Sequence, residues 1–400
     1  MRSMLLALSL VATGCFEDLQ VQNPLEPDNG PTQVQTQPLP QLDLDLLVAN
    51  LDTAFADVAG AQLVVSDDGQ AYEMWAVGQA TYAPDPEGDV AMDLDERMTI
   101  SSVSKLVAAI AMMQVLDDEG LDVDDPIAPH LPPSWRPLVH DDLDVGGPFE
   151  VTFADLLTMN SAIAFLPTPS GSISSGDYPT NARMLQALSL AAAPNRVGMY
   201  QNGSFTLVRI LIGELVYGLD ETAPNYETAA SDAYEDYLNA NVFGPVGIAD
   251  VGHVRPQAST SRAHQAPFDP TFQDGNGRLG WIPSDRDPRT AGSSELYMTA
   301  VEMARLVAYL RHDDNHTLLD ADLRDELIDR ELGLIESLDG VHGRYPTKSG
   351  TRGADGVGRG YRSAVMMFPR GVEVSVITNS MITGINGRLR DAFDDAWTTP

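Results

Sequence analysis

Two lysines are the residues of this chain whose spacing most clearly suggests chemistry. Among its 24 lysines and arginines, only Lys105 and Lys348 are lysines. An amine can release its proton, whereas a guanidinium stays protonated. Lys105 follows Ser102 by three residues, so both side chains lie on one face if the segment is helical. A serine hydroxyl becomes a good nucleophile when a neighbouring base takes its proton. The pair therefore predicts nucleophilic catalysis by Ser102 with Lys105 as its base.

The second lysine belongs to the segment Lys348-Ser349-Gly350-Thr351, which lies among strand-like stretches. If the fold brings Lys348 close to Lys105, its positive charge should depress the pKa of Lys105 and favour the neutral base. Ser101 is a neighbouring hydroxyl, but no lysine follows it at the same spacing. The simpler alternative for Ser102 is a helix-capping serine, a common use of this residue type.

The segment after Lys105 must place this pair inside the protein. Residues 106–116 are almost wholly apolar and Gly120 follows as a stop signal, which predicts a helix in the centre of the molecule. Upstream, apolar residues at helical spacing predict a helix over 44–58. Two strands, 63–65 and 72–77, are expected after it, joined by a turn.

The rest of the chain changes from helical patterns to strands towards its end. The patterns predict helices over 153–159, 181–192, 205–217, 234–242 and 299–311, strands over 361–368 and 372–378, and a last helix from 385. Helix and strands at both ends of a helical middle predict one α/β domain interrupted by an all-α insertion.

Three short segments together resemble one family. Ser102-Val103-Ser104-Lys105, Tyr200-Gln201-Asn202 and Lys348-Ser349-Gly350 occur in the order and rough spacing of serine β-lactamases and penicillin-binding proteins. The Tyr-x-Asn segment resembles class C β-lactamases, DD-peptidases and related esterases. The resemblance implies a β-lactamase-like α/β (α+β) fold, an antiparallel sheet flanked by N- and C-terminal helices. It covers residues 42–400, with 42–118 and 285–400 as the α/β part and 119–284 as the mostly helical part.

The same resemblance implies a role for each motif residue. Tyr200 would share the proton relay of Ser102 and Lys105 and protonate the leaving group. Asn202 would orient Lys105 and bind a substrate amide. The N–H groups of Ser102 and Thr351 would form an oxyanion hole, next to Gly350. In the third motif, Lys348 and Ser349 would bind a substrate carboxylate.

Two departures from the family pattern affect the expected fit of the substrate. The family often has Leu-Leu-Thr-His-Thr-Ser-Gly where this chain has methionine at Met159 and alanine at Ala162. Gln201 stands where the second motif usually has serine. We expect these positions to shape the pocket more than the chemistry.

Composition excludes several other classes of function. A net charge of −34 and a pI near 4.2 argue against nucleic acid, which requires a basic surface. The seven histidines lack the spacing of metal ligands, so neither a metal nor another cofactor is expected. A Ser-His-Asp hydrolase is disfavoured because no Gly-x-Ser-x-Gly elbow occurs.

The N-terminus resembles a bacterial lipoprotein signal. Residues 4–12 are apolar but too short to span a membrane, and they precede Cys15, the only cysteine. We expect a signal peptide over 1–14, a lipid on Cys15 and a flexible linker over 15–41, rich in polar residues and proline. This predicts a protein anchored to a membrane in the bacterial cell envelope, on the periplasmic or extracytoplasmic side.

The sequence therefore predicts a lipid-anchored serine hydrolase that needs no cofactor. It would act through a Ser102 acyl-enzyme on a β-lactam, a D-alanyl peptide or an ester. The alternative is a lipid-tethered protein that binds cell-wall peptides or penicillin without efficient turnover, although a pure binder has no need of Lys105.

The lysine pair generates the first prediction. Lys105→Arg should slow acylation at least ~100-fold, because a guanidinium cannot accept the proton of Ser102. Lys348→Arg should be milder if that residue mainly supplies charge. Acylation is followed with a chromogenic ester after circular dichroism has shown that both variants fold. Equal, mild losses in both variants would mean that the rarity of lysine carries no information about catalysis.

Overall fold

The computed structural model of the chain describes residues 40–161, 163, 200–252, 259–283, 290–353 and 358–399. The predicted signal peptide, Cys15, nearly all of the linker and the helix expected over 181–192 lie outside the described residues. Residues Gln41–Thr398 form one compact unit.

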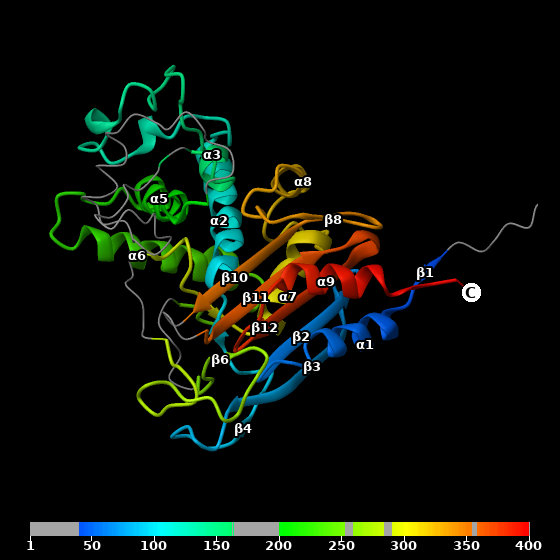
Figure 1. The fold of residues 1–400 in the computed structure, drawn as a ribbon. Coiled ribbons are helices and arrows are strands. Elements are labelled where there is room, and N and C mark those ends of the chain that lie inside the picture. Colours follow the sequence, from blue (N-terminus) through cyan, green and yellow to red (C-terminus); the bar gives the residue numbers. More distant parts are fainter. Residues whose placement is uncertain are drawn as a thin grey trace, which may run out of the picture. The chain divides into compact units, whose positions relative to one another are not determined.

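A sheet of neighbouring antiparallel strands forms the centre of this unit (Figure 1). Its central order is β10-β11-β12-β2-β3, so strands from the two ends of the chain meet where β12 pairs with β2. The five strands are β2 (Gly60–Asp67), β3 (Gln70–Thr81), β10 (Thr347–Gly353), β11 (Gly360–Met367) and β12 (Val372–Thr378). The turn predicted between the first two is present, with Asp68 and Gly69 both at positive φ.

Short strands extend this sheet and make it mixed. At one edge β4 pairs with β3, and near the other β6 pairs with β11 and, in parallel, with β13. The expected antiparallel arrangement is therefore confirmed for the central strands and is wrong for the β6–β13 pair. The remaining short strands are β1 (Gln41–Leu42), β4 (Val90–Ala91), β5 (Met98–Thr99), β6 (His264–Gln265), β7 (Tyr297–Met298), β8 (Leu338–Gly340), β9 (Gly343–Tyr345), β13 (Ser380–Met381) and β14 (Trp397–Thr398).

Both faces of the central sheet are buried. Leu63 and Val65 of β2 point to a core shared with α1 (Leu44–Ala54) and α9 (Ile385–Asp394), and Val64 between them points to the other core. This alternation follows from the two-residue period of a strand. On the second face α7 (Ala300–His312) packs against β2 and β12, as Figure 1 shows.

The helix that carries Lys105 lies in the larger core. α2 (Ser104–Glu119) has residues 106–113 at most 1% exposed, and it ends at Gly120, which adopts the left-handed conformation. The predicted central helix and its stop signal are thus confirmed. Around it in Figure 1 are α3 (Phe153–Leu157), α5 (Asn202–Ile212), α6 (Tyr226–Tyr237) and α8 (Ala321–Asp329). Of the described helices, none has the length and apolar character needed to cross a membrane.

Candidate active site

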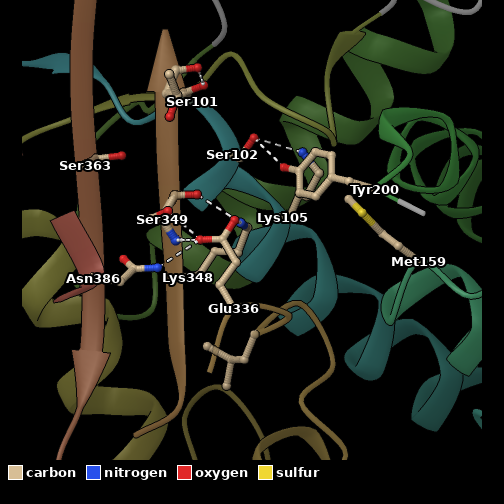
Figure 2. A network of polar contacts seen from close by, with 12 residues as sticks. Ser101, Ser102, Lys105, Met159, Tyr200, Glu336, Lys348, Ser349, Ser363 and Asn386 are labelled. Atoms are coloured by element: carbon tan, nitrogen blue, oxygen red, sulfur yellow. Dashed lines mark hydrogen bonds and ion pairs between the residues drawn. The ribbon is translucent and has the colours of Figure 1, made fainter. Parts of the chain in front are cut away.

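Ser102 lies in a single 3-10 turn, Ser101–Val103, that leads directly into α2. This continuous helical path places Ser102 and Lys105 on one face, as their spacing predicts. The Lys105 Nζ lies 3.1 Å from the Ser102 Oγ, and the Tyr200 hydroxyl donates a hydrogen bond of 2.7 Å to the same oxygen (Figure 2). Ser102 is partly exposed, so a substrate can reach its hydroxyl.

The amine of Lys105 is completely buried and has partners from distant segments. Besides Ser102, it contacts Oδ1 of Asn202 at 2.8 Å and the carbonyl oxygen of Ser293 at 2.5 Å. Asn202 is the first residue of α5, so that helix presents its amide to the lysine. A buried polar group is costly without such partners, and these contacts hold Lys105 against Ser102. The structure thus brings Asn202 to Lys105, as the motif predicts.

Tyr200 is held as a proton donor. Although 41% of the residue surface is exposed, protein atoms surround its hydroxyl, and burial raises the pKa of Tyr200 above its ordinary range. The hydrogen bond to Ser102 acts in the opposite direction but is the smaller effect. The ring also lies close to both lysines, with Nζ of Lys105 5.0 Å and Nζ of Lys348 5.5 Å from its centroid. A protonated phenol at this place can return a proton to a leaving group.

The two departures from the family pattern contact each other. The Gln201 N–H donates to Sδ of Met159 at 3.3 Å, and Met159 itself has a positive φ of 58°. Because Gln201 directly follows Tyr200, this bond attaches the backbone of the second motif to the end of α3. A hydrogen bond between the hydroxyls of Ser161 and Ser204, 3.1 Å long, joins the same two segments.

Ser101 links the nucleophile to the third motif. Its hydroxyl donates to the carbonyl oxygen of Thr351 at 2.7 Å, and its own φ of 48° is uncommon for a residue with a side chain. Gly350 is required beside it, because a Cβ there would lie 2.1 Å from the carbonyl oxygen of Ile100. Ser102 and Thr351, the expected donors of the oxyanion hole, are thereby held on adjoining segments, and their role stays a prediction.

The third motif is paired with a carboxylate that the sequence did not suggest. Lys348 is completely buried, and its Nζ donates to Oε1 of Glu336 at 2.6 Å and to the carbonyl oxygen of Ser349 at 2.9 Å. The backbone N–H of Ser349 donates to Oε2 of Glu336 at 2.9 Å, and its hydroxyl donates to the same oxygen. Figure 2 shows this cluster beside the Ser102 group. The predicted carboxylate-binding residues therefore bind a carboxylate of the chain itself.

Burial and the attraction between opposite charges together shift the pKa values of Glu336 and Lys348. Burial alone would raise the pKa of Glu336, but the charge of Lys348 and the hydrogen bonds from Lys348, Ser349 and Asn386 outweigh it and lower that pKa. Glu336 is therefore ionised at neutral pH. Burial lowers the pKa of Lys348, and Glu336 opposes this change. The carboxylate also offsets the positive charge that Lys348 was expected to exert on Lys105.

Over the part of the chain that the structure describes, no cluster of three or more His, Cys, Asp and Glu side chains could hold a metal ion. In the site itself a hydroxyl, an amine and a phenol lie together.

The comparisons with known proteins agree with this arrangement. The family model described as Beta-lactamase matches residues 48–394, so the chain belongs to the β-lactamase family. It is accordingly a serine hydrolase of the β-lactamase and penicillin-binding-protein type, with the β-lactamase-like α/β fold. No curated protein matches the chain.

Solved structures share the fold at low sequence identity. EstCE1, titled a hydrolase with promiscuous acyltransferase activity, aligns with a TM-score of 0.61 at 17% identity, over 88% of this chain and 99% of EstCE1. The D-amino acid amidase from Ochrobactrum anthropi SV3 has a TM-score of 0.61 at 16% identity, over 87% and 99%. The octameric penicillin-binding protein homologue from Pyrococcus abyssi has a TM-score of 0.55 at 18% identity, over 85% and 74%.

The geometry around Tyr200 generates the second prediction. Tyr200→Phe removes the phenol that contacts Ser102 and should lower the acylation rate by ~100-fold or more, the size expected of a proton-transfer group. Stopped-flow kinetics with an alkyl ester or an amide, whose leaving group needs a proton to depart, measure the rate. Tyr309→Phe on α7 removes a hydroxyl from a half-exposed ring elsewhere and serves as the matched control. A loss below tenfold in Tyr200→Phe would exclude the phenol from proton transfer.

Proposed function

We propose that this protein hydrolyses a small carbonyl compound through an acyl-enzyme on Ser102. The observation that supports it most is the contact of one hydroxyl, on Ser102, with both the amine of Lys105 and the phenol of Tyr200. A capping serine needs neither partner. The 3-10 turn that contains Ser102 receives no side-chain cap, so this geometry favours catalysis over the structural alternative.

The reaction follows from the positions of these groups. Ser102 Oγ attacks the substrate carbonyl carbon as its proton passes to the neutral amine of Lys105. The N–H groups of Ser102 and Thr351 stabilise the negative oxygen that forms. The leaving group departs with a proton from Tyr200, and the Lys105 ammonium, which holds the proton taken from Ser102, then reprotonates the Tyr200 oxygen. Water then attacks the carbonyl carbon of the ester and gives one proton to the neutral amine of Lys105. The amine passes this proton to Oγ of Ser102 as the bond to the acyl group breaks, which releases the acid and restores the hydroxyl.

The substrate classes considered are a β-lactam, a D-alanyl peptide and a small ester. All three share acylation of a serine and differ in the leaving group and in the access of water to the acyl-enzyme. The structural neighbours include a hydrolase with promiscuous acyltransferase activity, a D-amino acid amidase and a penicillin-binding protein homologue, and these support acyl-transfer chemistry rather than one substrate.

Covalent labelling tests this proposal. A fluorophosphonate or a penicillin should add one mass increment to the intact protein, located on Ser102 and missing from Ser102→Ala. Turnover of nitrocefin, a D-alanyl-D-alanine peptide and p-nitrophenyl esters then separates a hydrolase from a protein that is acylated but does not turn over. An adduct on Ser101 or Ser104, or one that persists in Ser102→Ala, would exclude Ser102 as the nucleophile.

We also propose that the protein is attached to a membrane of the bacterial envelope through a lipid on Cys15. The apolar residues 4–12 before the only cysteine support this placement. Cys15→Ser should release soluble protein or leave the precursor unprocessed, as shown by cell fractionation and intact mass. Wild-type protein that fractionates as soluble and carries no acyl mass would contradict the anchor.

A further inference from the structure

The carboxylate of Glu336 collects the donors of the third motif. Oε1 accepts from the Lys348 ammonium, and Oε2 accepts from the N–H and the hydroxyl of Ser349 and, at 3.3 Å, from the amide of Asn386 (Figure 2). These four donors match the roughly four acceptor sites of one ionised carboxylate. This set is therefore already used within the chain.

Glu336 is fixed in this position from two sides. Its own N–H donates to the carbonyl oxygen of Thr347 at 3.3 Å, and its neighbour Ile335 forms a bridge with Thr347, so its backbone follows the start of β10. Asn386 approaches from α9. If a substrate were to displace Glu336, the 2.6 Å ion pair with the fully buried Lys348 ammonium would have to break. Breaking a buried ion pair is costly, so Glu336 stays in place.

The paired charges lie close to Tyr200, the residue that we propose protonates the leaving group. Nζ of Lys348 is 5.5 Å from the ring centroid of Tyr200, the residue that donates to Ser102 and can protonate the leaving group. The Glu336 side chain is 28% exposed, so its charge reaches the open part of the site. The net charge of −34 adds a general repulsion of anions.

We propose that Glu336 is a specificity-determining residue that makes this site select esters and amides whose leaving group carries no carboxylate. This inference rests on the proposed acyl-enzyme function of Ser102. Glu336 takes the place of a substrate carboxylate, so an anionic leaving group meets a neutral ion pair instead of a free ammonium. Such a group gains no charge-assisted hydrogen bonds there.

The test compares two esters of the same N-acylglycine, the phenyl ester and the 3-carboxyphenyl ester, by kcat/KM. The wild-type protein should hydrolyse the phenyl ester at least as well as the carboxyphenyl ester. Glu336→Gln removes the carboxylate that occupies Lys348 and Ser349, so the carboxylate of the ester can pair with the Lys348 ammonium instead. The ratio of carboxyphenyl to phenyl activity should then rise by about tenfold or more. Asp339→Asn removes the same charge from a side chain that is 86% exposed and should change the ratio by less than about twofold.

The outcomes separate this inference from the proposed function. A wild-type preference of tenfold or more for the carboxyphenyl ester, or an unchanged ratio in Glu336→Gln, would overturn the inference while both esters are still hydrolysed. If neither ester nor a fluorophosphonate acylates Ser102, the proposed function fails and the inference fails with it. Should Glu336→Gln not fold, the wild-type preference alone decides.

Discussion

The site depends on the burial of one amine. Lys105 is fully enclosed, and the partners of its Nζ come from residues 97 and 188 positions further along the chain as well as from the adjacent turn. An amine in this environment is stable only with such partners. The contacts therefore require α2, the start of α5 and the segment around Ser293 to meet at one atom. The same requirement positions the Ser102 hydroxyl, because it is one of the partners that the amine needs.

The two lysines share burial but not chemistry. The Nζ of Lys105 donates hydrogen bonds to hydroxyl, amide and carbonyl oxygens. Lys348 contacts an ionised carboxylate, which favours its charged form. Glu336 thus weakens the electrostatic effect of Lys348 on Ser102. It also occupies the Lys348 ammonium, which is therefore not free to bind a substrate carboxylate. The ring of Tyr200 lies close to both amines, between Lys105 beside Ser102 and the Lys348–Glu336 ion pair.

Local patterns allowed the sequence to predict part of this site. Ser102 and Lys105 are three residues apart, and residues at this spacing lie on the same face of a helix, so their contact could be predicted. The apolar run after them predicts a helix buried on all sides. Ser293 was missed because it contributes a carbonyl oxygen, which every residue type has. Glu336 was missed because it is one of 58 acidic residues and no motif distinguishes it before β10 is folded beside it. The parallel pairing of β6 with β13 was missed because strands of two residues leave no periodicity.

The central claim is that Ser102 attacks a substrate carbonyl whose oxygen binds between the N–H groups of Ser102 and Thr351. The hydrogen bond from Ser101 to Thr351 joins the two segments that carry these groups. A crystal structure of the protein after reaction with a p-nitrophenyl phosphonate tests it most directly, since phosphorus mimics the tetrahedral carbon. We expect phosphorus bonded to Oγ of Ser102, with one phosphonyl oxygen about 3 Å from the N–H groups of both Ser102 and Thr351. Phosphorus on another residue, or a phosphonyl oxygen directed away from both N–H groups, would contradict the account.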